Sequence, residues 1–255
     1  MFVGMMSVLL ASSTLLHAAE PSRKLLKRGE YNPADSTVEL FKAIDDGDLD
    51  VKLIPKDSTQ AKVVITNKTK EPLNIKLPDA FAGVHILAQM GGMGGGGMSG
   101  GSQGQAMGGG MGGGGMGGGG MGGGGGGGMF NVPAEKVGDF DVACACLEHG
   151  KPEPRSTMKY EIRPLVKVTD KPGVAEVCRL LGTGKVDQRV AQAALWHLNN
   201  NMSWEELAAK EMKPLIGEPY PYFQPQELQM AIALAKYGVD TEAAKKQEPK
   251  SPGEL

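Results

Sequence analysis

The chain has 255 residues, of which 27 are Lys or Arg, 29 are Asp or Glu and 39 are Gly, and its formal net charge is −2. This balance excludes a strong overall electrostatic attraction to nucleic acid or to anionic lipid. Because 27 of the glycines lie between Gly91 and Gly128, the remainder has ordinary glycine content. It is long enough for one small domain with an appendage, or for two small domains.

The amino terminus has the pattern of a cleavable signal peptide. Residues 1–16 carry no charged side chain, and Leu16-His17-Ala18-Ala19 supplies small residues before Glu20. We therefore expect a signal peptide over 1–19, a leader over 20–35, and a mature protein that is periplasmic or secreted. No later segment is long and apolar enough to cross a membrane, so we expect no membrane span after cleavage.

A short helix is expected directly after the leader. Ser36-Thr37-Val38-Glu39 has the form of a capping box, and Val38, Phe41 and Ile44 repeat at helical spacing. Gly47 occupies the position of a carboxy-terminal cap.

Alternating apolar residues then indicate short β-strands on both sides of the glycine tract. About seven strands separated by turns predict a mainly β fold with α, namely an immunoglobulin-like antiparallel β-sandwich over 36–168. The segment 90–129 would be a disordered Gly/Met-rich insert between two strands. The alternation is carried by Leu49, Val51, Leu53, Leu73, Ile75, Leu77, Val84, Ile86, Phe140, Val142, Cys144, Cys146, Met158, Tyr160 and Ile162.

Helices are expected after the strands, in a small domain over 169–238. Ser203-Trp204-Glu205-Glu206 has capping-box form, and Pro225 suits the first turn of a last helix that ends before Gly238. Helices this short must pack on one another or on the sandwich. Lys, Glu, Gln and Pro dominate 239–255, which predicts a disordered tail.

The Gly/Met tract is most simply a low-complexity loop, and we expect no cofactor and no resident metal. The alternative is a periplasmic copper-binding protein, because thioethers and thiolates are ligands for Cu(I). A second version of a metal site uses the Cys-x-Cys-x-x-His spacing that precedes Gly150. The candidate ligands are Met107, Met111, Met116, Met121, Cys144, Cys146 and His149.

Three cysteines in an exported chain favour one disulfide and one free thiol. Cys144 and Cys146 are two apart on an expected strand, so their side chains share a face and do not pair with each other. We expect one of the two, preferably Cys146 at the strand's end, to pair with Cys178 on the first helix. Such a bridge would stabilise the chain by roughly 3 to 4 kcal/mol.

The string Gln192-Ala193-Ala194-Leu195-Trp196 resembles the glutamine motif of bacterial surface thioester domains. That resemblance implies an internal thioester between Gln192 and a cysteine, for which Cys178 is the candidate. Helical periodicity gives a simpler interpretation, in which Val190, Ala194 and Leu198 form a packed face. Arg189, Gln192 and Trp196 then lie on another face.

The mature chain as a whole resembles an uncharacterised family of exported bacterial proteins. The strings that carry the resemblance are Cys146-Leu147-Glu148-His149-Gly150, Leu180-Leu181-Gly182-Thr183-Gly184 and Trp196-His197-Leu198. No catalytic motif is recognised. We therefore expect a non-enzymatic binding or structural protein whose partner is an unknown protein or an envelope component, with copper binding and thioester chemistry as alternatives.

Overall fold

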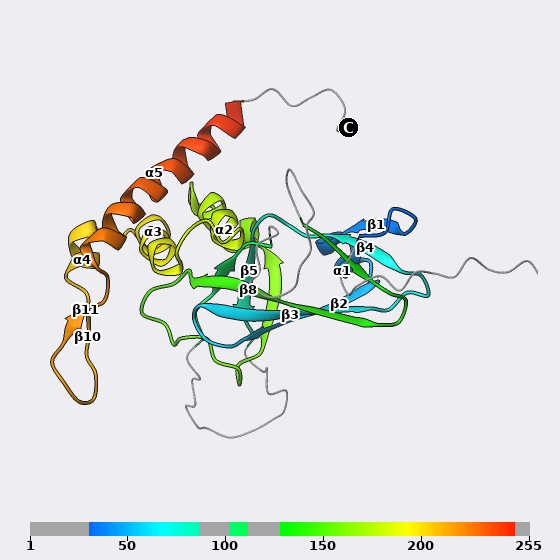
Figure 1. Cartoon of the computed structure of the whole chain (residues 1–255), viewed down its shortest axis with the longest axis horizontal. Coiled ribbons are helices and arrows are strands. Elements are labelled where there is room, and N and C mark those ends of the chain that lie inside the picture. The colour runs from blue at the N-terminus through cyan, green and yellow to red at the C-terminus, as the bar shows by residue number, and fades with distance from the viewer. Residues whose placement is uncertain (1–30, 87–102, 112–127, 248–255) are drawn as a thin grey trace, which may run out of the picture.

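In a computed structural model, residues 31–86, 103–111 and 128–247 are described, and the expected signal peptide lies outside them. Strands make up one end and the middle of the molecule, and helices cover one side of the sheet and extend beyond it (Figure 1). The expectation of a mixed, mainly β chain with a helical region is therefore confirmed.

The main sheet is a closed barrel in which all neighbouring strands are antiparallel. Its period-two sequences place alternate side chains inside the barrel. In spatial order the strands are β2 (Leu49–Pro55), β3 (Gln60–Asn67), β8 (Val137–Cys146), β6 (Met107–Gly109), β5 (Phe81–His85) and β9 (Tyr160–Pro164).

Closure of this sheet replaces the expected immunoglobulin-like sandwich. β9 pairs with β5 along its whole length and with β2 at Leu53 and Tyr160, while β6 joins β5 to β8. These links remove the free edges that two facing sheets would have. The sandwich prediction was wrong because it placed β6 in a loop.

β6 comes from within the Gly/Met tract, so the expected disordered insert 90–129 is wrong for residues 103–111. Gly108 pairs with Ala145 and Gly109 pairs with Cys144. A Cβ on Gly108 would lie 2.7 Å from the Cys178 Sγ, and one on Gly110 would lie 2.5 Å from the Cys178 carbonyl oxygen. Only a strand without side chains at these positions fits between the barrel and the helix that carries Cys178.

A second, three-stranded sheet lies at one end of the barrel. β1 (Ser36–Glu39) is parallel to β4 (Leu73–Lys76), which is antiparallel to β7 (Met129–Val132). The expected helix from Ser36 is therefore displaced, and only α1 (Leu40–Asp45) is helical. The residues expected to form its capping box pair with β4 instead, and Glu39 caps the shorter helix by accepting from the Lys42 N–H at 2.8 Å.

The carboxy-terminal part is mainly helical, as expected, but it also contains a short β-hairpin that the sequence did not predict. The capping box of Ser203 and Glu206 is present, and Pro225 is the first residue of the last helix. The elements are η1 (Leu165–Lys167), α2 (Val174–Gly182), α3 (Gln188–Asn200), α4 (Trp204–Ala208), the hairpin β10 (Glu211–Met212) and β11 (Tyr220–Pro221), and α5 (Pro225–Gln247).

α5 continues past Gly238, so the expected tail 239–255 is helical as far as Gln247. Gly238 is buried within the helix, where a Cβ would lie 2.9 Å from the Gly173 carbonyl oxygen. The glycine thus permits close packing rather than ending the helix. Two contacts hold the last turns of α5 against α2 and the turn before it. Lys245 of α5 pairs with Glu176 at 3.0 Å, and the Glu242 carboxylate of α5 accepts from the Gly173 N–H at 2.9 Å.

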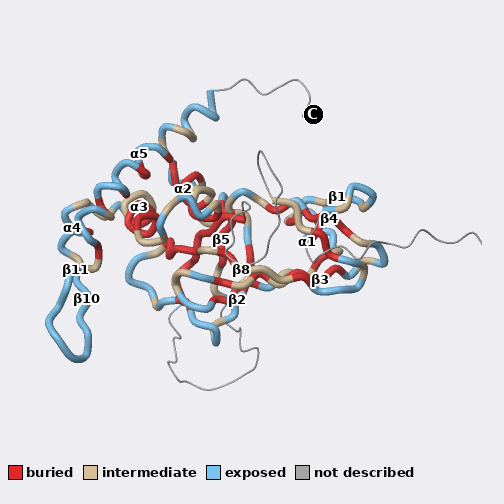
Figure 2. The backbone as a smooth tube through the Cα atoms, viewed as in Figure 1, coloured by how far each residue is buried: buried red, intermediate tan, exposed pale blue. Residues whose placement is uncertain are grey.

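Two apolar cores lie on opposite sides of the β8 backbone. Cys144 belongs to the core inside the barrel, with Phe81 and Met107, whereas Ala145 belongs to the core between the barrel and the helices, with Leu195. Buried segments accordingly concentrate in the barrel and in the parts of the helices that face it (Figure 2). Within the described ranges, no helix is both long and apolar enough to cross a bilayer.

Candidate functional site: a cleft between the barrel and the helices

A small cleft of about 80 Å³ lies where β8 ends against α3. It has polar amide and hydroxyl groups, aromatic rings and one side chain of each charge in its wall, and the chain segments that supply them are far apart in sequence. The lining residues are Ser58, Thr59, Cys146, Glu153, Gln188, Arg189, Gln192, Trp196, Tyr222 and Phe223.

One wall of the cleft is formed where the pairing of β8 with β3 ends. Their last paired residues are Gln60 and Ala143, and the Cys144 N–H then donates to the Thr59 carbonyl at 2.7 Å. Beyond this point the Gln192 carboxamide serves the same edge: its oxygen accepts from the Cys146 N–H and its nitrogen donates to the Cys146 carbonyl, both at 2.8 Å. A helix side chain thus satisfies a buried strand edge that would otherwise lack partners.

Gln188 contacts the same strand edge two residues earlier, at Cys144. Its Nε2 donates to the Cys144 carbonyl at 3.3 Å. Gln188 and Gln192 are one helical turn apart, so both side chains face β8. Gln192 is 3 % exposed, and both polar atoms of its carboxamide are occupied.

Trp196 anchors an aromatic cluster beside this edge. Its ring centroid lies 5.6 Å from that of Tyr222, 5.9 Å from that of Phe223 and 4.8 Å from that of His149. Trp196 is only 6 % exposed, yet its indole N–H has no hydrogen-bond partner in the described part of the chain. A buried donor without an acceptor costs free energy, so such a group is usually completed by an ordered water or by another molecule.

Two cations border the aromatic rings. The Arg189 guanidinium lies 5.3 Å from the Tyr222 centroid and 5.6 Å from that of Phe223, and its Nε pairs with Glu227 at 2.6 Å. The Lys210 ammonium lies 5.3 Å from the Trp196 centroid and 5.2 Å from that of Tyr222. These contacts fix positive charge beside the aromatic rings.

His149 is held neutral beside Lys210. The Lys210 Nζ donates to the His149 Nε2 at 2.9 Å. Burial, and then the Lys210 charge, lower the pKa of His149 below its usual range. A neutral imidazole accepts this hydrogen bond, whereas an imidazolium would repel the ammonium.

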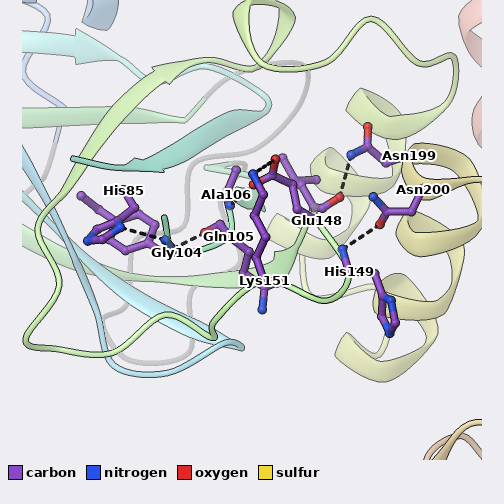
Figure 3. A network of polar contacts seen from close by, with 11 residues as sticks. His85, Gly104, Gln105, Ala106, Glu148, His149, Lys151, Asn199 and Asn200 are labelled. Atoms are coloured by element: carbon purple, nitrogen blue, oxygen red, sulfur yellow. Dashed lines mark hydrogen bonds and ion pairs between the residues drawn. The ribbon is translucent and has the colours of Figure 1, made fainter. Parts of the chain in front are cut away.

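A polar network holds the turn that carries His149 (Figure 3). The Glu148 carboxylate accepts from the Ala106 N–H at 2.9 Å and pairs with Lys151 at 2.5 Å. The His149 N–H donates to the Asn200 side chain at 3.1 Å. The turn is thereby fixed both to residues 103–111 of the Gly/Met tract and to the end of α3.

The same tract piece is anchored on its other side (Figure 3). The Gly104 N–H donates to the His85 Nδ1 at 2.9 Å, and the Tyr160 hydroxyl donates to the Gln105 carbonyl at 2.7 Å. Burial raises the pKa of the Tyr160 hydroxyl, which keeps it a donor. Residues 103–111 are thus a structural part of the barrel.

The expected disulfide between Cys146 and Cys178 is not formed, because all three cysteines are free thiols. The Cys146 thiol contacts the Ser58 carbonyl at 3.9 Å and lines the cleft, whereas Cys178 lies in the core between the barrel and α2. Burial raises the pKa of the Cys146 and Cys178 thiols to about 12 and raises that of Cys144 as well. These thiols are protonated at neutral pH.

Three of the candidate metal ligands share the barrel core, whereas His149 does not belong to it. Met107 and Met111 are buried in the barrel core with Cys144, and His149 is engaged by Lys210. Among the residues that the structure describes, no group of three or more His, Cys, Asp or Glu side chains is arranged to hold a metal ion. Met116 and Met121 lie outside the described residues.

The two residues of the expected thioester, Gln192 and Cys178, have other roles in the structure: Gln192 pairs with a strand backbone, and Cys178 packs in the core. Gln192 bonds to the backbone of Cys146, while the Cys178 Sγ lies against Gly108 and Leu147. The structure thus supports the simpler interpretation of the Gln192 string, in which Val190 and Ala194 are buried in the core between the helices and the barrel.

Comparison with known proteins finds no matching family model, no matching curated protein and no matching solved structure.

Sequence reasoning singled out Gln192, Trp196, His149 and Cys146 but did not connect them. It placed Arg189 on the same helix face as Gln192 and Trp196 without giving it a role, and it missed Lys210, Tyr222 and Phe223. One signal for the last two was present, because Tyr220-Pro221-Tyr222-Phe223 concentrates aromatic residues in a chain with few of them.

Proposed function

We propose that this chain is an exported, non-enzymatic binding protein that holds a hydrogen-bond acceptor group of a partner molecule in the cleft between β8 and α3. The acceptor is a carboxylate or a carbonyl. The cleft is about 80 Å³, the space of two or three water molecules, so it takes one terminal group and not a whole ligand. The partner is therefore a larger molecule of which one group enters the cleft.

The observation that carries this proposal is the buried indole N–H of Trp196, which lacks an acceptor among the described residues. The indole is a donor only, so the group that completes it must be an acceptor. Arg189, 43 % exposed at its side chain, is a second donor in the same wall. Glu153 lies exposed at the same cleft. Its carboxylate would favour a partner molecule that carries a hydrogen-bond donor or a positive charge near the acceptor group.

The protonation states in the cleft favour binding over covalent chemistry. The pKa of about 12 keeps the Cys146 thiol protonated, and a thiol is a far weaker nucleophile than a thiolate. His149 is neutral, but its Nε2 already accepts from Lys210. Neither group is poised to activate the other.

Export is supported by the sequence of residues 1–19, which lie outside the described residues. The small-residue site before Glu20 is the pattern at which signal peptidases cut. Recovery of the protein outside the cytoplasm with Ala19 or Glu20 as its first residue would support this part of the proposal. An intact amino terminus in the cytoplasmic fraction would contradict it.

Sodium benzoate and benzamide are suitable probes, because each offers one acceptor group on a planar ring. Calorimetric titration should show saturable binding of at least one of them with a dissociation constant on the order of 1 mM, as expected for a fragment of this size. Stronger binding of benzoate would identify a carboxylate as the preferred group, and stronger binding of benzamide would identify a neutral carbonyl.

Matched tryptophan variants test the location. Trp196→Phe keeps an aromatic ring but removes the indole N–H, so we expect affinity to fall about tenfold, the value of one hydrogen bond. Trp204→Phe makes the same change on α4, outside the cleft, and should leave affinity unchanged. Equal loss in both variants, or no binding of either probe, would contradict the proposal.

A further inference from the structure

The hairpin between α4 and α5 ends in an exposed apolar tip. Leu215 is 106 % exposed and Ile216 is 93 % exposed, and every residue from 211 to 221 is exposed. We call residues 213–218 the finger. Large apolar side chains this exposed at the end of a projection are typical of an interaction site.

The finger is presented by an ordered base. Met212 pairs with Tyr220, and the Tyr222 N–H donates to the Lys210 carbonyl at 2.7 Å. Gly217 has φ +111°, a backbone conformation that permits the tight turn at the tip. The hairpin projects away from the helices on the side of α4, while α5 runs in the opposite direction (Figure 1).

An apolar groove of about 350 Å³ lies elsewhere on the same chain, between α3, α4 and α5. Trp204 stacks on His197, with ring centroids 4.1 Å apart, to form one wall. Ile232 is 45 % exposed on another wall, and Ala235 is buried. The lining residues are His197, Leu198, Trp204, Ile232, Ala235, Lys236, Val239 and Asp240.

The finger and the groove are compatible in size and polarity, and each carries one charge of either sign. The groove has the volume of about ten water molecules, which is more than the side chains of one leucine and one isoleucine require. At its edge Lys236 and Asp240 form an exposed ion pair with a separation of 2.7 Å. The finger carries one charge of each sign, Lys213 and Glu218, on either side of its apolar tip.

We propose that the finger of one copy of this chain occupies the groove of a second copy. Leu215 and Ile216 of one copy enter between Trp204 and Ile232 of the other. Lys213 then pairs with Asp240, and Glu218 pairs with Lys236, in place of the ion pair between Lys236 and Asp240. The finger points away from its own groove, so the contact forms between copies.

The contact is heterologous, because each copy offers a finger at one site and a groove at another. It therefore builds head-to-tail chains whose length increases with protein concentration. A contact dominated by two side chains is smaller than a standard interface, so we expect a dissociation constant on the order of 100 µM.

Sedimentation velocity of the exported chain, from a few micromolar to the millimolar range, measures this association. We expect a weight-average sedimentation coefficient that rises with concentration. The finger variant Leu215→Ser/Ile216→Ser and the groove variant Ile232→Arg should each remain monomeric. Met230→Ser, an equally exposed apolar residue of α5 outside the groove, should associate as the wild type does.

Mixing the two variants gives the sharpest result. The finger variant keeps an intact groove and the groove variant keeps an intact finger, so an equimolar mixture should form a one-to-one dimer and nothing longer. Both variants change exposed residues, so circular dichroism should show unchanged folding.

A wild type that stays monomeric at millimolar concentration would overturn the proposal, as would a mixture that stays monomeric. Binding of a monomeric wild type to phosphatidylglycerol vesicles, with loss in the finger variant, would assign the finger to a lipid surface instead. Association that survives in both single variants would assign it to another surface.

Discussion

The Gln192 carboxamide and the Cys146 backbone form a two-hydrogen-bond pair, with both bonds 2.8 Å long. On the other side of β8, Cys146 pairs with Met107 of β6. A helix side chain therefore takes the place of a neighbouring strand at this position. This pair fixes α3 to the barrel and sets the position of Trp196, one turn further along the same helix.

Replacement of Gln192 by leucine should destabilise the protein by about 2–4 kcal/mol. The substitution keeps the packing volume but leaves a buried N–H and a buried carbonyl of Cys146 without partners. Urea unfolding followed by circular dichroism measures the change. Gln188→Leu is the matched control: it removes one longer bond from a partly buried residue, so its cost should be below about 1.5 kcal/mol. Equal costs would contradict the account of the strand edge.

Gly110→Ala should destabilise the barrel by about 1–3 kcal/mol or more, the usual cost of overpacking. Its Cβ would lie 2.5 Å from the Cys178 carbonyl oxygen and 3.0 Å from the Gly182 Cα, and neither backbone atom moves easily. Met107→Leu, a change of similar volume in the same segment, should cost less than about 1.5 kcal/mol. An unchanged thermal midpoint for Gly110→Ala would show that β6 does not close the barrel as described.

All three thiols should resist iodoacetamide in the native protein at pH 7.5 and react after unfolding in urea without a reductant. Cys146 should be the first to react as pH rises, because it lines the cleft. A raised thiol pKa in the folded state favours the protonated form, so stability should fall as pH rises above about 8.5, where thiols of the unfolded chain ionise. Mass spectrometry counts the alkylated residues. Only one reactive cysteine in urea would establish the disulfide that the structure lacks.

The end of α5 should depend on the Glu176 carboxylate. Hydrogen bonding to Arg179 is the main cause that lowers the pKa of Glu176, and Lys245 adds to it. A lowered carboxyl pKa contributes stability above the unfolded value of about 4.3, and this contribution is lost as pH falls through the folded pKa.

Lys245→Ala should therefore increase amide hydrogen exchange in residues 239–247 at pH 7, with a global cost below about 1 kcal/mol because Lys245 is 58 % exposed. Lys246→Ala is the control, since Lys246 makes no ion pair with any described residue. Similar exchange in both variants would mean that the ion pair does not hold the helix end.

Local signals in the sequence predicted much of the secondary structure. Alternation identified β2 and β8, and the capping box at Ser203 identified the start of α4. These predictions succeeded because they rest on contacts within one strand or one turn.

Barrel closure could not be predicted in the same way. It depends on three residues of β6 inside a Gly/Met tract that has many similar triplets, and the choice among them is made by distant contacts of Gly108 and Gly110 with Cys178. The prediction that the last helix ends before Gly238 failed for a related reason. The close packing of Gly238 against Gly173 outweighs the preference of glycine for helix ends.

The candidate site was predicted only in fragments. The sequence around Gln192 suggested a thioester between two side chains. The partner of Gln192 is instead the backbone of Cys146, and a backbone contact leaves no signal in the sequence. Lys210 and Tyr222 reach Trp196 only because the hairpin base brings them together.

The most direct test of the binding proposal is the indole region of a ¹H–¹⁵N correlation spectrum during titration with sodium benzoate and, separately, benzamide. The chain has two tryptophans, so two indole signals are expected, and Trp204→Phe assigns them. We predict that the Trp196 signal moves downfield and saturates with at least one probe, because its N–H gains an acceptor, while the Trp204 signal stays in place. An unchanged Trp196 signal with both probes, or equal movement of both signals, would contradict the cleft as the binding site.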